Sequence, residues 1–182
     1  NKGRKSDITF AMRKGVVIRE ATTQEEFDEY YRIYVQWSQR KGLEIQSLET
    51  MRTALALRSN RRLFLALHEE KVVAGSIMRY VPGGIAEYSA NSSIDEALAL
   101  KPNALLVWSG IQWACAEGLR KFSMGAAHPF LRHFGGTVVP LYRYRRDQTV
   151  LRRYDVSEWA IGTLRRIKSS LMNRGVTEKK RI

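Results

Sequence analysis

The sequence predicts an α/β (α+β) fold in which helices flank a mixed central sheet. Residues 62–90 hold three apolar, partly β-branched segments separated by turn residues at 68–71 and 82–84, a pattern typical of an antiparallel meander. An apolar run over 104–116 precedes a short strand-like segment over 120–124. This order predicts a buried helix that crosses over to a parallel strand.

The residues before the meander predict a helix, a strand and two further helices. Residues 1–15 have the pattern of the last turns of a helix, and residues 16–21 form a strand. A capping-box pattern at residues 22–26 opens a helix that runs to about Lys41, and a shorter helix covers 47–58. The aromatic residues of the longer helix recur at helical spacing, so they are interpreted as core: Phe27, Tyr30, Tyr31, Tyr34 and Trp37.

The apolar helix is predicted to begin at Pro102-Asn103, with Asn103 as its N-cap, and to end at Gly118. Because almost every residue from 104 to 116 is apolar, we expect this helix to be buried nearly all round. Three of its side chains are therefore interpreted as packing residues, namely Trp108, Trp113 and the inert thiol Cys115.

The remainder of the chain predicts a helical turn over 129–134, a strand over 137–144 and an amphipathic helix over 157–172. We expect three parts: a connecting helix at 1–15, one domain at 16–156, and a basic amphipathic helix with a polar tail at 157–182.

Composition narrows the class of protein. A hydrophobic content of 44% indicates a globular chain, and the single cysteine excludes an internal disulfide framework. No apolar run approaches the roughly 20 residues that span a bilayer, so we expect a soluble, cytoplasmic protein. The net charge of +13 is concentrated at the ends of the chain, because residues 16–139 carry only +1. Such ends suit an acidic partner or peripheral contact with a membrane, or they serve only solubility.

Three stretches carry a resemblance to a known family: LFLALHEEKVVAGSIMRYVPGGIAEYSANSS, LLVWSGIQWACAEGLRKFSMG and PFLRHFGGTVVPLYRYRR. With them, the chain over about residues 5–146 resembles the GNAT acyltransferase fold. More narrowly it is similar to the FemAB/BioF-type branch, which includes the peptidoglycan-bridge aminoacyltransferases of the cell wall. The opening ITFAMRKGVVIREA resembles the helix that joins two GNAT-like domains in that branch.

The resemblance implies a single GNAT-like domain whose sheet contains a splayed parallel pair of strands. It implies an N-acyltransferase that transfers an acyl or aminoacyl group to an amine. The donor would be acyl-CoA or aminoacyl-tRNA as co-substrate, with no tightly bound cofactor. Members of this branch usually carry two such domains, whereas this chain has room for one. Residues 97–103 also lack the glycines with which ordinary GNAT enzymes hold the pyrophosphate of acetyl-CoA.

Acyl transfer to an amine requires proton transfer and a held oxyanion, and the strand over 85–90 is the expected place. Glu87, Tyr88 and His128 are the catalytic candidates. By alternation, Glu87 and Ser89 are predicted to share one face, and Tyr88 and Ala90 the other. A solvent-facing Glu87 without a catalytic role stays an open alternative. His128 is equally well explained as a loop residue that bonds only to backbone.

The remaining site candidates are expected to bind donor or acceptor. Lys101 and Asn103 lie where the apolar helix begins, so they are placed to meet a phosphate, although an exposed lysine beside an N-cap explains them too. The others are polar or cationic residues predicted near the same cleft: Ser89, Asn91, Arg79, Arg132 and Tyr142. The three histidines have no metal-ligand spacing, so no metal is predicted.

A second hypothesis is a non-catalytic half-domain that binds a partner domain or a cell-envelope precursor. The missing glycine loop and the missing second domain favour it. Partners of the chain would then include a second GNAT-like domain or another copy in a homodimer. Binding of tRNA through the basic residues ranks third, and it would show as a steep loss of affinity with salt.

Overall fold

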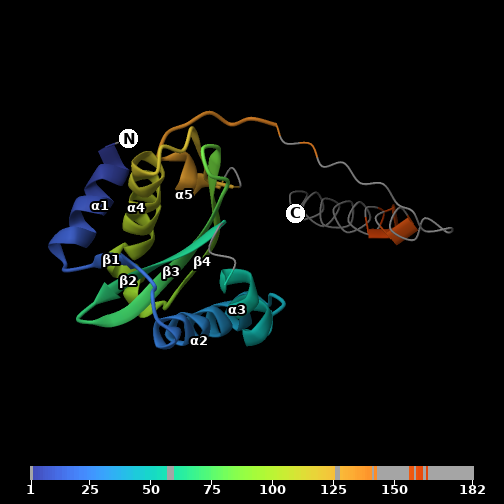
Figure 1. Cartoon of the computed structure of the whole chain (residues 1–182), viewed down its shortest axis with the longest axis horizontal. Helices are drawn as coiled ribbons and strands as arrows, with labels where there is room; N and C mark the ends of the chain where they lie inside the picture. Colours follow the sequence, from blue (N-terminus) through green and yellow to red (C-terminus); the bar gives the residue numbers. More distant parts are fainter. Residues whose placement is uncertain are drawn as a thin grey trace, which may run out of the picture. The chain divides into compact units, whose positions relative to one another are not determined.

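Five strands form one sheet in the order β1-β2-β3-β4-β5, so each strand lies beside its neighbour in sequence (Figure 1). The computed structural model describes residues 2–56, 60–125, 128–140, 142, 156–157, 159–161 and 163. The strands are β1 (Val17–Glu20), β2 (Arg61–His68), β3 (Lys71–Tyr80), β4 (Ile85–Ser93) and β5 (Lys121–Ser123). Strands β1 to β4 pair antiparallel and β4 pairs with β5 in parallel, which confirms the predicted mixed sheet.

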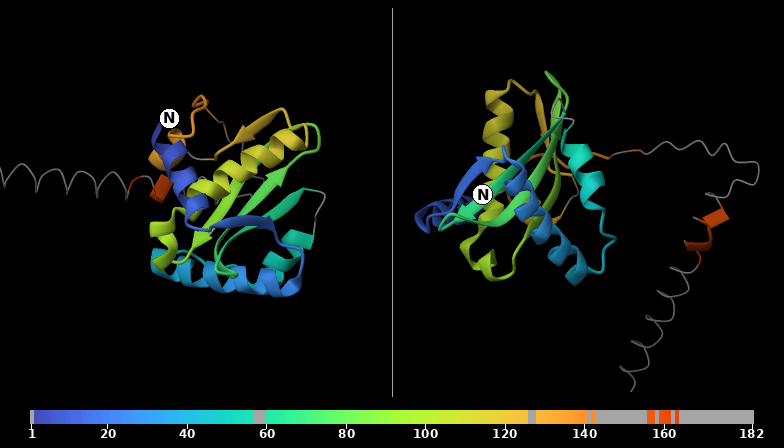
Figure 2. Two further views of the ribbon diagram at one scale, coloured as in Figure 1. Left: turned by 90° about the vertical axis from the view of Figure 1, so that its left-hand side faces the viewer. Right: turned by 60° about the horizontal axis from the view of Figure 1, so that its bottom comes forward.

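Helices cover both faces of this sheet, as Figure 2 shows from two sides. They are α1 (Lys2–Arg13), α2 (Gln24–Lys41), α3 (Leu48–Ala56), α4 (Pro102–Ala116) and α5 (Pro129–Arg132), with a 3-10 turn η1 (Glu96–Leu100) before α4. One core, centred on Leu106 and Met78, lies between the sheet and the α1/α4 side. A second, centred on Tyr30 and Leu65, lies under α2 and α3.

The predicted start of α2 is confirmed in detail. The Thr23 hydroxyl accepts from the Glu26 backbone N–H at 3.3 Å, and the Glu26 carboxylate accepts from the Thr23 N–H at 3.1 Å. This reciprocal capping box satisfies two N–H groups that would otherwise be unpaired. The helix ends at Gly42, which takes the left-handed φ of 62°.

Helix α1 is part of the domain's core. Ala11 is fully buried and Ile8 packs against the same cluster, so α1 contributes apolar surface to the α4 side. The described residues fall into two units, Asn1–Val138 and Val139–Ile182, and the site discussed below lies in the first.

Two predictions about α4 are wrong. Its N-cap is Lys101, in a left-handed conformation with φ of 60°, and Asn103 is already helical and bonded elsewhere. The helix is also not buried all round, because the sheet and α1 leave one side open. Trp108 is 39% exposed and Cys115 is exposed, whereas Trp113 packs against Phe64 and Tyr80 as predicted.

The C-terminal predictions are only partly testable. Residues 137–140, which are described, form no regular secondary structure, so the strand expected over 137–144 is wrong for that part. Leu141 and residues 143–144 lie outside the described residues. Of the helix expected over 157–172, the described residues 157, 159–161 and 163 are helical, and the rest lies outside the described part.

Candidate functional site

The parallel pairing of β4 with β5 is short, and we call the open edge of β4 beyond it the wedge. Strand β5 pairs with β4 over three rungs only, from Ile85↔Lys121 to Glu87↔Ser123. Strand β4 continues along β3 as far as Ser93. From Tyr88 onward, no described strand pairs with the other edge of β4, so its backbone groups are left open on that side. Ligands of open α/β sheets bind at such a point, where adjacent strands diverge at their carboxyl ends.

A β-bulge lies at the mouth of this wedge. Met78 of β3 pairs with Tyr88 and Ile77 pairs with Ala90, so Ser89 has no partner on β3. The bulge shifts the alternation by one residue. Ala90 therefore lies on the α2/α3 face with Glu87, and the prediction that it shares a face with Tyr88 is wrong. Bulges re-aim side chains and backbone groups, and they are common beside active sites.

On the α4 face, the bulge brings Tyr88 and Asn91 to the same side of the sheet. The Tyr88 side chain packs into the α4-side core, and burial raises the pKa of its hydroxyl, against the opposing effect of the nearby Ser76 hydroxyl. Ser76 is itself fully buried and donates to the carbonyl of Ala90 at 3.0 Å. The Tyr88 hydroxyl thus remains protonated at neutral pH.

The start of α4 faces the end of β4. The Asn91 amide donates to the Asn103 side-chain oxygen at 2.9 Å, and the Asn103 amide reaches the Ser93 hydroxyl at 3.4 Å. With Asn103 occupied in this way, no side chain caps α4, and Lys101 is exposed beside its first turn. An uncapped helix start with a free lysine is a favourable environment for an anion.

Glu87 lies on the opposite face of β4 from Tyr88, at the closed end of the wedge. Its carboxylate accepts from the Arg79 guanidinium at 2.8 Å, and both side chains are partly exposed. Two of the predicted site residues are thus brought together as an ion pair. Tyr88 does not join them, since it points to the other side of the sheet.

His128 caps α5 through its ring. The Phe130 backbone N–H donates to Nδ1 of His128 at 3.2 Å. In the neutral ring, a proton must then lie on Nε2, so the exposed edge of this histidine donates a hydrogen bond and does not accept a proton. His128 follows Gly125 by three residues, and an added Cβ at Gly125 would lie 3.4 Å from the Tyr88 carbonyl oxygen.

The roles of the last two candidates stay predictions. Arg132 is exposed on α5. Tyr142 is 76% exposed and belongs to the unit Val139–Ile182, so its role at the site stays a prediction.

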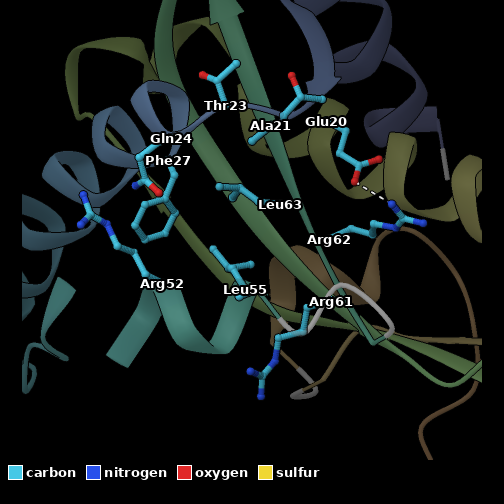
Figure 3. Close-up of a pocket in the computed structure, with 12 residues that line it drawn as sticks. Glu20, Ala21, Thr23, Gln24, Phe27, Arg52, Leu55, Arg61, Arg62 and Leu63 are labelled. Atoms are coloured by element: carbon cyan, nitrogen blue, oxygen red, sulfur yellow. Dashed lines mark hydrogen bonds and ion pairs between the residues drawn. The ribbon is translucent and has the colours of Figure 1, made fainter. Parts of the chain in front are cut away.

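Neither of two cavities among the described residues is lined by the predicted site residues. The first, of about 320 Å³, lies where β1 ends, α2 begins and β2 starts (Figure 3). Its apolar wall is made by Phe27, Leu55 and Leu63, and the Glu20–Arg62 ion pair lies at its rim. The second, of about 400 Å³, lies between α1 and α4 beside Trp108 and Phe134.

Sequence reasoning missed the arginines of the first cavity. Arg62 pairs with Glu20 at 3.0 Å, and Arg52 pairs with Asp28 at 2.9 Å, which lowers the pKa of the Asp28 carboxyl. Arg61 donates to the carbonyl of Ala54 at 2.7 Å. The Arg61-Arg62 doublet at the start of β2 was the available signal, but charged residues at strand starts are too common to single out from sequence.

Over the described residues, no group of three or more His, Cys, Asp or Glu side chains could hold a metal ion. The same part of the chain contains no helix with the length and apolarity needed to cross a membrane.

Comparison with known proteins identifies the family. The family model described as "Acetyltransferase (GNAT) domain" matches residues 2–136. No curated protein sequence matches the chain. Similar solved structures include the aminoglycoside acetyltransferase meta-AAC0020 from an uncultured soil metagenomic sample, with 17% identity, a TM-score of 0.56, and coverage of 72% of this chain and 97% of that one. The aminoglycoside 6'-N-acetyltransferase AAC(6')-IG from Acinetobacter haemolyticus is another, with 16% identity, a TM-score of 0.55, and coverage of 73% of this chain and 99% of that one.

FemX is a third similar structure, with 11% identity, a TM-score of 0.60 and coverage of 74% of this chain. Only 52% of FemX is covered, so the chain spans about half of its length. Identities this low show a shared fold alone. The family model, in contrast, matches most of the chain, and this match shows that the chain belongs to the GNAT acetyltransferase domain family.

Proposed function

We propose that this chain is an amine N-acyltransferase that takes its acyl group from a coenzyme A thioester bound in the wedge between β4 and β5. The observation that carries the proposal is the open edge of β4 from Tyr88 to Ser93, which ends beside the uncapped start of α4. An extended donor arm can hydrogen-bond along such an edge, while its phosphates meet Lys101 and the helix N-terminus.

The residues present fit this donor in part. The exposed Lys101 and the first-turn N–H groups of α4 suit a phosphate, but residues 97–100 contain no glycine that would let backbone approach a pyrophosphate closely. Asn103 is held by Asn91 and Ser93, so its side chain shapes the entrance instead of capping the helix. We infer that the phosphates are held more by charge than by a glycine-rich cradle.

The reaction forms one bond and breaks one. The amine nitrogen attacks the thioester carbonyl carbon, the C–S bond breaks, one proton leaves the nitrogen, and the departing thiolate takes up a proton. We assign the first proton to Glu87, whose carboxylate lies at the closed end of the wedge. The backbone at the Ser89 bulge is the proposed site of oxyanion stabilisation.

The departing thiolate must receive its proton from a group that is protonated at neutral pH. Tyr88 meets this condition because burial raises the pKa of its hydroxyl. His128 can act only as an imidazolium, a form in which Nδ1 carries a proton and releases its bond from the Phe130 N–H. They are the two candidates for the general acid, and separate Tyr88→Phe and His128→Gln variants distinguish them.

The test is release of free thiol from acetyl-CoA and longer acyl-CoAs in the presence of a panel of amines. We expect Glu87→Gln to lower kcat at least a hundredfold at neutral pH, since general-base catalysis contributes roughly that much or more. Arg79→Gln, read in kcat, keeps the Glu87 carboxylate and so separates loss of its ion-pair partner from loss of the base. Turnover that is unchanged in Glu87→Gln would remove the assigned base.

A second candidate function is a half-domain that acts only with a second GNAT-like domain. The 52% coverage of FemX favours it, together with the missing glycine loop. An aminoacyl-tRNA donor, the alternative that the resemblance implied, finds no support in the comparisons. A melting-temperature screen with acyl-CoAs, coenzyme A and a charged tRNA separates these cases, because a bound ligand stabilises the native state by mass action.

A further inference from the structure

The α2/α3 face of the sheet carries a row of charged residues that leads to the wedge. Arg61 of β2 lies directly opposite Arg79 of β3, and Arg79 lies opposite Glu87 of β4. Glu87 in turn is on the last rung that joins β4 to β5, opposite Ser123. The register of four adjacent strands thus places two arginines and one glutamate in one row that ends at the closed end of the wedge.

The two arginines are an unusual pair. Like charges directly opposite each other on neighbouring strands are destabilising. Arg79 is compensated by Glu87 at 2.8 Å, whereas Arg61 donates only to the neutral carbonyl of Ala54, and no carboxylate of the described residues forms an ion pair with it. The row therefore has one positive charge in excess at Arg61, on the side away from the wedge.

Space for a ligand exists beside this excess charge. Arg61 lines the cavity of Figure 3, whose wall is formed by Phe27, Leu55 and Leu63. The other two arginines of that cavity, Arg52 and Arg62, are already paired with Asp28 and Glu20. Among the described residues, Arg61 is therefore the arginine of this cavity whose charge no carboxylate neutralises in an ion pair.

We propose that the acceptor amine also carries a carboxylate, which Arg61 binds while the amine reaches Glu87 at the wedge, with Arg79 lying between the two. The proposal rests on the proposed acyl transfer and names its substrate class: a short peptide bound by its C-terminal carboxylate. Arginine forks match the planar geometry of carboxylates, and such charge-assisted hydrogen bonds are among the stronger ones.

The strand spacing gives this acceptor a length. Arg61 and Glu87 are separated by two strand intervals, or roughly 10 Å. An extended peptide rises about 3.3–3.6 Å per residue, so about three residues connect a carboxylate at Arg61 to an amine at Glu87. A single amino acid is too short to make both contacts.

The experiment compares triglycine with triglycinamide as acceptors, using the acyl-CoA that supports turnover, and adds glycine as the short control. We expect triglycine to have a KM about tenfold lower than triglycinamide, and glycine a kcat/KM at least tenfold lower than triglycine. Arg61→Gln should raise KM for triglycine about tenfold and leave triglycinamide unchanged, while Arg61→Lys retains part of the preference. Arg13→Gln, on the other face of the sheet, is the matched control for loss of one charge.

Two outcomes overturn the inference while acyl transfer itself stands. One is equal use of triglycine and triglycinamide by the wild-type protein. The other is an Arg61→Gln variant that shifts KM equally for both acceptors, since a merely structural role would do so. Absence of thiol release with every amine and every donor is a different result, because it overturns the proposed function and the inference with it. The melting temperature of each variant verifies that it is folded.

Discussion

Tyr30 is the residue at which burial and hydrogen bonding conflict most clearly. Its side chain projects from α2 into the core and is fully buried, and its hydroxyl has no partner with good hydrogen-bond geometry in the described part of the chain. Burial raises the pKa of Tyr30 to about 12, against a smaller opposing effect of the nearby Ser92 hydroxyl. An unpaired buried hydroxyl costs about 1–3 kcal/mol.

We therefore expect Tyr30→Phe to raise the free energy of unfolding by about 1 kcal/mol at neutral pH. The pH dependence provides a second readout. The unfolded hydroxyl ionises near its model value of 10.0, so the stability contributed by the protonated Tyr30 is fully present below pH 10 and is lost as pH rises towards 12. Urea unfolding of both proteins across this window should show a shallower decline for the variant. Equal slopes, or a variant less stable at neutral pH, would contradict the assignment.

At the scale of elements, two glycines allow helices to lie close to the sheet. A Cβ added to Gly75 of β3 would come within 2.4 Å of Cδ2 of Tyr30, a rigid ring atom of α2. A Cβ added to Gly110 of α4 would come equally close to Cε of Met78, the far end of a flexible side chain. The two contacts are the same in distance and differ in how well the neighbour can move.

This difference makes the two alanine substitutions a matched pair. Gly75→Ala is expected to lower the free energy of unfolding by about 2 kcal/mol, because an overpacked rigid contact forces backbone shifts. Gly110→Ala is expected to change it by less than about 1 kcal/mol, since alanine's higher helix propensity offsets the displacement of Met78. Chemical denaturation of both variants measures the two values. A larger loss in Gly110→Ala would mean that Met78 is as rigidly held as Tyr30.

Sequence patterns predicted the elements whose signals are local. The capping box at Thr23 and Glu26, the meander and the crossover to β5 follow from spacing, turn residues and apolar runs. The bulge at Ser89 does not, because it depends on the pairing of β4 with β3, and no residue type marks it. The same shift in alternation made the predicted face of Ala90 wrong.

The site was predictable only in part for the same reason. Sequence position indicated that Glu87 and Asn91 lie near the end of the strand over 85–90, and that Asn103 lies at the start of the apolar helix. It could not reveal the Arg79–Glu87 pair or the Asn91–Asn103 bond, since both join side chains from different elements. Asn103 looked like an N-cap because it follows Pro102, but the Asn91 side chain of β4 donates a hydrogen bond to it instead. The role of Arg61 required the register between β2 and β3.

For the whole molecule, the packing of α1 on the α4-side core is the feature with the largest expected effect on stability. The sequence suggested a connecting helix, and the structure places Ala11 and Ile8 of that helix against the α4-side core. Removal of residues 1–13 would expose that apolar surface. We expect the melting temperature of the shortened chain to fall by roughly 4–12 °C, because a loss of about 2–3 kcal/mol shifts a domain of this size by about 2–4 °C per kcal/mol. A shortened chain that melts like the full chain would show that α1 is only a connector.

The three rungs that join β4 to β5 also have a consequence for how the chain folds. Strands β2, β3 and β4 are joined by short turns, so their pairing closes small loops and can form early. The β4–β5 contact must wait for η1 and α4 to lie across the sheet, and it then gains only three rungs. We expect the wedge to be the last feature to assemble and the first to open in native-state hydrogen exchange. Substrate could then reach it through local opening while the meander stays closed.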